Sequence, residues 1–226
     1  NTCPRAKFYQ ASSSEMFGEI LTKKQNERTP FNPRSPYAVS KVFGHFIVKN
    51  YRESYNLFAV SGILFNHESP FRGEEFVTRK ITKGLVNIIN GKQKFLELGN
   101  IYSKRDWGFA KEYTEVMWKM LQQKKPDDYV VSTGRTYSIK DFINLCTDYL
   151  KIKTKWIGKG LDEKLINLKN NKIIIKISPK YFRPSEVDLL IGDSSKAKKI
   201  LKWKPKTNLK SLVKIMLDEE IKYFLS

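Results

Sequence analysis

Apolar residues recur along this chain at two different spacings, which predicts alternating helices and strands. Between Tyr37 and Tyr55 they fall three or four positions apart, as on one helix face, whereas 57–65 is a continuous apolar run typical of a buried strand. Similar patterns predict strands at 7–12, 94–98, 128–132, 153–158 and 172–178, and helices at 76–90, 109–123, 138–150, 194–201 and 209–224. This alternation predicts an α/β fold with a largely parallel sheet.

Polar segments separate these elements. Residues 19–36 hold three prolines and predict a loop, and the polar residues 99–107 predict another. The stretch 161–172 is also polar and is expected to be mobile, and 181–187 is expected to form a loop.

Polar residues follow three of the predicted strands directly. They lie at 13–15, at 66–68 and at 99–100. In open α/β sheets, ligands bind at the carboxyl ends of the strands. We therefore expect the functional site to be built from these three segments.

The composition narrows the class of protein. The 226 residues suffice for one large domain or two small ones, and a hydrophobic content of 40% allows a packed core. Two cysteines and two histidines, without a carboxylate cluster at ligand spacing, predict neither a disulfide framework nor a metal site and fit a reducing cytoplasm. No apolar run reaches the roughly 18 residues of a membrane span, and the polar residues 1–7 do not predict a signal peptide.

The formal net charge is +19, which raises the question of a nucleic-acid partner. The lysines are spread along the chain, with only a mild excess after residue 150. Such a surface attracts phosphorylated small molecules but does not form a focused nucleic-acid interface. We therefore predict no nucleic-acid partner.

Tyr37 and Lys41 form a Y-x-x-x-K pattern at the start of a predicted helix. Four-residue spacing places both side chains on one helix face, and an ammonium beside a phenol favours the phenolate. A tyrosine in this setting can remove a proton from an alcohol. The pattern also occurs by chance in many helices, so it predicts a catalytic pair only with further support.

Ser13 and Glu15 supply that support, because they follow the first predicted strand. A serine hydroxyl can bind the same substrate oxygen as the tyrosine, and a glutamate can act as a second base. The alternative is that Glu15 is an ordinary exposed carboxylate at a turn. The four residues together favour an active site.

Long stretches of the chain resemble the GDP-mannose 4,6-dehydratase family, a branch of the extended short-chain dehydrogenases. The most specific are 62–70 (Gly-Ile-Leu-Phe-Asn-His-Glu-Ser-Pro) and 104–108 (Lys-Arg-Asp-Trp-Gly). The resemblance continues, in the family's order, through 8–18, 32–41, 56–60, 76–81, 98–100 and 181–188. It covers nearly the whole chain.

The resemblance implies a fold and a domain organisation. Residues 1–70 would form the C-terminal part of a Rossmann-like, doubly wound parallel sheet that carries the catalytic residues. Residues 71–226 would mainly form a smaller α/β domain that binds the nucleotide sugar, with some segments returning to the Rossmann sheet. The implied assembly is a homodimer or homotetramer.

The resemblance also implies the reaction. GDP-mannose would be dehydrated to GDP-4-dehydro-6-deoxy-mannose with an NADP that is regenerated within each turnover, a first step towards GDP-fucose and related deoxy sugars. Tyr37 would take the proton of the C4 hydroxyl, Glu15 would remove the C5 proton, and Ser13 would assist. Lys41 would hold the nicotinamide ribose beside Tyr37.

Further roles carry over at matching positions. His67 and Arg72 would contact the cofactor, with Arg72 reaching that of a neighbouring subunit. Contacts to the GDP-sugar would come from Asn66, Lys80, Arg105, Arg183 and Glu186, and guanidinium groups suit a pyrophosphate. A packed loop histidine, a surface arginine and a local Arg183–Glu186 ion pair are the simpler alternatives.

Three departures from the family pattern matter. Ser13 stands where the family usually has Thr, Phe71 replaces an Arg before Arg72, and Ser14 stands where related thymidine- and uridine-diphosphate sugar dehydratases have an Asp.

No G-x-x-G-x-x-G turn for a pyrophosphate occurs in the chain, and the sequence opens within an apolar, strand-like stretch, which suggests an N-terminally truncated sequence. Another nucleotide-sugar dehydratase or epimerase, or a basic binding module without the cofactor half, are the alternative functions.

Overall fold

A computed structural model describes residues 3, 5–19, 23–182 and 190–225. The chain divides into two compact units. The first unit comprises Asn1–His67, Arg105–Thr136 and Val187–Lys206, and the second comprises Glu68–Lys104, Tyr137–Glu186 and Thr207–Ser226. Each unit is described by itself.

The first unit is built on a three-stranded parallel sheet. Its strands are β1 (Phe8–Ser13), β2 (Ala59–Leu64) and β7 (Asp128–Val131), in the order β1-β2-β7. Ser13 is in register with Leu64, and Leu64 with Val131, so the three strands end together at one edge. The parallel sheet predicted from the sequence is therefore present in this unit.

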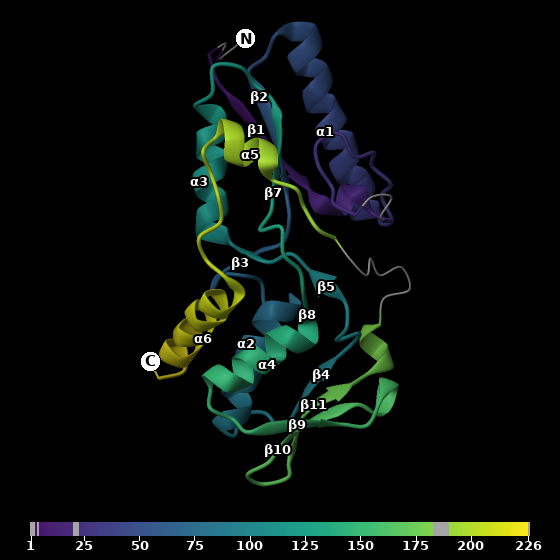
Figure 1. The fold of residues 1–226 in the computed structure, drawn as a ribbon, viewed down its shortest axis with the longest axis vertical. Coiled ribbons are helices and arrows are strands. Elements are labelled where there is room, and N and C mark those ends of the chain that lie inside the picture. The colour runs from purple at the N-terminus through teal and green to yellow at the C-terminus, as the bar shows by residue number, and fades with distance from the viewer. Residues whose placement is uncertain (1–2, 4, 20–22, 183–189, 226) are drawn as a thin grey trace. The chain divides into compact units, whose positions relative to one another are not determined.

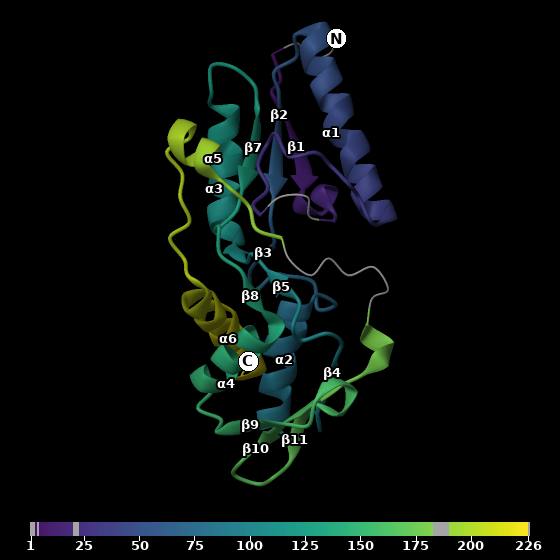
Figure 2. The same cartoon turned by 45° about the vertical axis from the view of Figure 1, so that its right-hand side comes forward.

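Helices cover both faces of this sheet. The helix α1 (Pro36–Tyr55) lies on one face, and α3 (Ala110–Leu121) and α5 (Ser195–Ile200) lie on the other (Figures 1 and 2). The residues of β2 are buried throughout, as expected for a strand with helices on both sides. Val60 and Leu64 pack with Tyr113 and Trp203 in one apolar cluster, while Ile63 packs in another, which follows the two-residue period of a strand.

An ion pair joins α1 to the sheet. The guanidinium of Arg52 donates two hydrogen bonds to the carboxylate of Asp128, at 2.9 and 2.8 Å, and a third to the carbonyl of Ala59 at 3.1 Å. Arg52 and Asp128 are both largely buried. A two-pronged, charge-assisted contact of this kind fixes direction as well as distance, so it sets how α1 lies on the strands.

The second unit contains a mixed sheet and three helices. The strands lie in the order β4-β11-β10-β9. β4 and β11 are parallel, and the other neighbours are antiparallel. Their bounds are β4 (Leu96–Leu98), β9 (Thr154–Ile157), β10 (Lys164–Asn167) and β11 (Ile173–Ile177). The helices α2 (Val77–Ile89), α4 (Ile139–Tyr149) and α6 (Leu209–Leu225) contact one another (Figure 1).

The remaining elements are short. They are the strands β3 (His67–Glu68), β5 (Lys104–Arg105), β6 (Gly108–Phe109) and β8 (Tyr137–Ser138), and the 3-10 turns η1 (Ser14–Phe17), η2 (Gly160–Asp162) and η3 (Pro179–Tyr181).

Two predictions about polar segments were wrong. The stretch 161–172 contains β10, which pairs with β9 on one side and β11 on the other. Its Leu165 is fully buried. The loop predicted at 99–107 contains the strand β5. β5 is short and polar, and β10 holds only two apolar residues, so a hydrophobic pattern alone does not reveal either strand. Among the described residues, no helix has the length and apolar content that a membrane crossing requires.

Gly18 closes the turn after η1 and is fixed there by its surroundings. Its φ is +56°, and a β-carbon at this position would overlap the carbonyl oxygen of Asn32. Gly91 has a similar φ of +75° but open space around it. A substitution at Gly91 therefore meets backbone strain alone, whereas one at Gly18 meets both backbone strain and steric overlap.

We expect Gly91→Ala to cost about 1 kcal/mol of unfolding free energy, because only the left-handed conformation is penalised. Gly18→Ala should cost about 3 kcal/mol or more, since the backbone at Asn32 must also move. Urea denaturation of both variants measures the difference. Equal losses would show that the Gly18 turn adjusts freely.

Candidate active site

Tyr37 and Lys41 lie on the first turns of α1. The helix begins after Ser35, whose hydroxyl accepts a hydrogen bond from the backbone N–H of Ala38. Tyr37 is 54% exposed. The Nζ of Lys41 lies 5.5 Å from the Tyr37 ring centroid and donates to the carbonyl of Ala11 in β1 at 2.9 Å. The ammonium is thus held between the tyrosine and the strand, with further N–H groups for a ligand.

Ser13 and Glu15 lie at the carboxyl end of β1. The hydroxyl oxygen of Ser13 caps η1 by accepting from the N–H of Glu15 at 3.2 Å. Because this bond uses a lone pair, the hydroxyl hydrogen remains able to donate to a ligand. The helix α1 packs against both β1 and η1. The four residues predicted to be catalytic therefore come from elements that touch one another.

Asn66 and His67 follow β2 at the same edge of the sheet. The Nδ1 of His67 lies 2.9 Å from the carbonyl oxygen of Phe65. A carbonyl only accepts, so in the neutral ring Nδ1 carries the hydrogen and Nε2 is an acceptor. The ring stacks on Tyr113 with centroids 4.9 Å apart, which fixes its orientation.

Arg72 is engaged inside the second unit. Its Nε lies 3.3 Å from the carboxylate of the buried Glu68, and its guanidinium lies 3.5 Å from the Phe76 ring centroid. Thr78 donates a further bond of 2.5 Å to Glu68. These contacts give Arg72 a structural role, and its role as a cofactor contact stays a prediction.

Lys80 lies on α2 in the second unit. Its Nζ donates to the carbonyl of Glu97 at 2.8 Å and lies 3.7 Å from the ring centroid of Tyr181. Burial lowers the pKa of Lys80. At the nearby Gly99 a β-carbon would overlap the Tyr181 carbonyl oxygen, so a glycine after β4 lets the two segments meet.

The other predicted substrate contacts are placed only in part. Arg105 is the second residue of β5 and is half-buried. Arg183 and Glu186 lie outside the described residues. Among the described residues, no group of three or more His, Cys, Asp or Glu side chains is arranged to hold a metal ion.

Asp106 is buried, and the sequence predicted no role for it, although it lies in the stretch 104–108. Its carboxylate accepts bonds from Thr133 N–H and Gly134 N–H, both at 2.8 Å, and from the Thr133 hydroxyl at 2.6 Å. Burial raises the pKa of Asp106 to about 6, although these donors act to lower it. Asp106 thus fixes the turn that follows β7.

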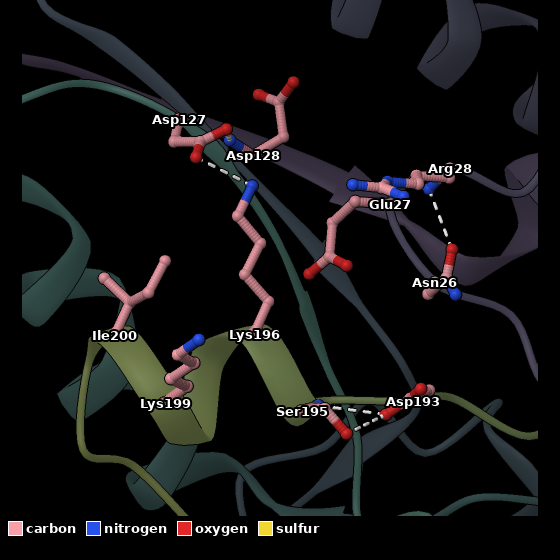
Figure 3. Close-up of a pocket in the computed structure, with 10 residues that line it drawn as sticks. All are labelled: Asn26, Glu27, Arg28, Asp127, Asp128, Asp193, Ser195, Lys196, Lys199 and Ile200. Carbon is pink, nitrogen blue, oxygen red and sulfur yellow. Dashed lines mark hydrogen bonds and ion pairs between the residues drawn. The ribbon is translucent and has the colours of Figure 1, made fainter.

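A separate cavity of about 630 Å³ lies in the first unit. Asp127 and Asp128, which line it, stand at the amino end of β7, and Figure 3 shows Lys196 of α5 reaching Asp127. In a parallel sheet the amino ends lie opposite the edge that carries Ser13. None of the predicted site residues lines this cavity.

Comparison with protein families gives one match over most of the chain. A family model described as "GDP-mannose 4,6 dehydratase" matches residues 1–216. A protein of that name from Drosophila melanogaster is 51% identical over 95% of this chain and 54% of its own length. Its namesake from Dictyostelium discoideum is 50% identical over 97% of this chain and 62% of its own length. The chain thus spans little more than half of these relatives.

Solved structures share the fold. RMD from Pseudomonas aeruginosa complexed with NADPH has a TM-score of 0.81 at 20% identity, over 96% of this chain and 67% of that structure. A dTDP-glucose 4,6-dehydratase from Bacillus anthracis in complex with NAD has a TM-score of 0.77 at 19% identity, over 99% and 63%. At these identities the similarity shows a Rossmann-like α/β fold, as the sequence predicted.

In Asp106→Asn the side-chain NH₂ group faces backbone N–H groups, so two donors meet. We therefore expect the free energy of unfolding to fall by about 1–3 kcal/mol near neutral pH. A folded pKa of about 6 exceeds the ordinary aspartate value, so the wild-type carboxyl contributes stability that is complete below about pH 4 and is lost as the pH rises through about 6. The stability difference between wild type and Asp106→Asn should therefore grow, by about 3 kcal/mol, as the pH falls from about 7 to about 4.

Urea unfolding of both proteins across this pH range measures the difference. The exposed Asp148 provides the control, because Asp148→Asn removes the same charge without touching a buried acceptor. A difference that shrinks with falling pH would show that Asp106 has a depressed pKa instead.

Proposed function

The chain belongs to the GDP-mannose 4,6 dehydratase family, and we propose that the protein dehydrates GDP-mannose to GDP-4-dehydro-6-deoxy-mannose with NADP. The observation that carries the proposal is the arrangement of four residues. Tyr37 and Lys41 lie on a helix that packs against β1 and η1, which carry Ser13 and Glu15. The names of the relatives support the substrate.

The residues of this chain fit the nicotinamide end of the cofactor. Lys41 has N–H groups beyond the one bound to Ala11, and Tyr37 is exposed beside it, so both can bind ribose hydroxyls. His67, at the same edge, would also contact the cofactor, as the family resemblance implies. The cofactor would supply the chemistry that the side chains lack, by accepting a hydride from C4 and returning it at C6.

Proton transfers fall to the side chains. Tyr37 would take the proton of the C4 hydroxyl while Ser13 donates a hydrogen bond to the same oxygen. The resulting C4 ketone makes the C5 proton acidic, and Glu15 would remove it. Ser14 is only 2% exposed, so it is not placed to protonate the leaving group. Glu15 would therefore pass the proton to the C6 hydroxyl, which leaves as water. Once the hydride has returned at C6, C5 would take up a proton, and the one held by Tyr37 balances it.

We propose that Lys80 contacts the GDP-sugar, as its position in the family resemblance implies. The lowered pKa and partial burial of Lys80 support a contact with an anionic ligand, because a phosphate would stabilise the charged ammonium. Arg105, Arg183, Glu186 and Asn66 complete the proposed set.

Assembly and compartment are also proposals. We propose a homodimer or homotetramer, supported by exposed apolar side chains along α1, among them Phe43 and Tyr55. The cysteines are both free, Cys3 exposed and Cys146 buried, which is compatible with the reducing cytoplasm proposed for this enzyme.

Tyr37→Phe removes the proposed proton acceptor without changing the ring. We expect kcat for formation of the 4-keto sugar to fall by about 10²–10⁴-fold, the usual contribution of a general base. The product is measured by chromatography after incubation of the complete gene product with GDP-mannose and NADP. Tyr51→Phe is the control, because Tyr51 is also exposed on α1 but lies away from β1's carboxyl end. Full activity in Tyr37→Phe would overturn the mechanism.

Glu15→Gln removes the base for C5 but leaves Tyr37 in place. The first hydride transfer should still occur, so reduced cofactor and 4-ketomannose nucleotide should accumulate in a single turnover while dehydration stops. Ultraviolet absorbance of the reduced cofactor in a stopped-flow experiment measures this. If Glu15→Gln blocks cofactor reduction as strongly as Tyr37→Phe does, the two residues do not act in successive steps.

A further inference from the structure

A buried polar chain runs from β1 through α1 to β7. The Oγ of Ser12 lies 3.2 Å from Nδ1 of His45, and Nε2 of His45 lies 3.8 Å from the carboxylate of Asp128. Ser12 is 3% exposed and His45 5%. Ser12 directly precedes Ser13, and His45 lies on the same helix as Lys41. These three side chains therefore connect β1, which carries Ser13, with α1, which carries Tyr37 and Lys41.

The charge on Asp128 determines the state of the histidine ring. Burial acts to raise the pKa of Asp128, but the two bonds from Arg52 outweigh it and lower the pKa overall. Asp128 is therefore a carboxylate and can only accept. The Nε2 that faces it carries the hydrogen, which leaves Nδ1 of the neutral ring to accept from the Ser12 hydroxyl. Phe31 and Phe46 meet the ring edge-on at 5.1 and 5.7 Å and hold its plane.

Serine, histidine and aspartate in series also form the relay of a nucleophilic enzyme. Burial argues against that use, because a substrate cannot reach a serine that is 3% exposed. A buried polar network instead makes one packing arrangement more favourable than its neighbours, because its groups lose their partners in any other arrangement. This network does so for the position of α1 on β1.

We infer that His45 is a positioning residue, whose neutral ring ties α1 to β1 through Ser12 and so sets Tyr37 and Lys41 relative to Ser13 and Glu15. The inference rests on the proposed function only for the consequence in catalysis. The link itself is a property of the free protein and can be tested without substrate.

Protonation of His45 should reverse the hydrogen bond with Ser12, because a charged imidazole has no acceptor nitrogen and its Nδ1–H can only donate to the serine oxygen. The charged groups around the ring are Asp128 from β7, and Arg52 and Lys49 from α1 itself. Burial, followed by these two cations, lowers the pKa of His45, and only Asp128 opposes them. Donation from Ser12 to His45 is thus intact above the ordinary histidine value of about 6.5, and its direction reverses as the pH falls through the lower, folded-state value.

Nitrogen NMR of histidine-labelled, complete gene product tests the link directly. The His45 signals are those that disappear in His45→Gln. We expect the tautomer with hydrogen on Nε2 at neutral pH, and protonation at a pH below that of an exposed histidine. Backbone amide signals of Ser13 and Lys41 should shift with the same midpoint. The opposite tautomer, or amide signals that ignore the ring, would overturn the inference even if the enzyme is active.

Measurements of kcat and KM then distinguish a positioning role of His45 from a role in packing alone. His45→Phe keeps a ring but removes both polar contacts, and Ser12→Ala removes only the donor. Each should lower kcat about tenfold with KM unchanged, since small displacements of catalytic groups are costly. The kcat of the double variant should be no lower than that of the less active single variant, because both substitutions break the same hydrogen bond. His45→Gln, whose amide can accept from Ser12, should restore kcat. Its kcat should also not fall at the acidic pH at which the wild-type ring is protonated.

The outcomes are distinguishable. Additive losses in the double variant, or losses that match the drop in melting temperature and persist in His45→Gln, would show an ordinary packing role. If wild type itself makes no 4-keto sugar, the proposed function fails, and the tautomer and amide measurements still decide the inference about His45.

Discussion

The contact between Arg52 and Asp128 is the constraint on which the first unit depends. It is buried and two-pronged, and the same guanidinium also binds the carbonyl of Ala59. One side chain of α1 is thereby tied to both β2 and β7. Removing one partner would leave a buried, unpaired charge, which costs about 3–5 kcal/mol in other proteins. Because α1 carries Tyr37 and Lys41, its attachment to the strands is also the attachment of the proposed active site.

The elements with a strong hydrophobic period could be predicted from the sequence. The predicted helix 37–55 and strand 57–65 correspond to α1 and β2, with ends that differ by one or two residues. The strand β10 could not, because only Leu165 and Ile166 of its four residues are apolar and Leu165 alone is fully buried. Such a strand is formed by pairing on both sides, which a local pattern does not record.

The proposed catalytic residues could also be found from the sequence, because two of them form a short pattern and the others follow a predicted strand. His45 and Asp106 could not. Ser12 and His45 are 33 positions apart, and Asp106 binds a turn 27 positions away from it. Their contact partners depend on which strands become neighbours, so these contacts can be identified only in the folded structure. Ionised and neutral states at these positions likewise depend on burial, which composition does not reveal.

The amine of Lys80 offers a natural reporter of ligand binding. Burial lowers its pKa, so near neutral pH more of it is the uncharged, nucleophilic form than in an ordinary lysine. For its degree of exposure it should therefore be acylated readily by amine-reactive reagents. An anion bound there would restore the proton and slow the modification, so peptide mass spectrometry could read out occupancy of the second unit without any turnover.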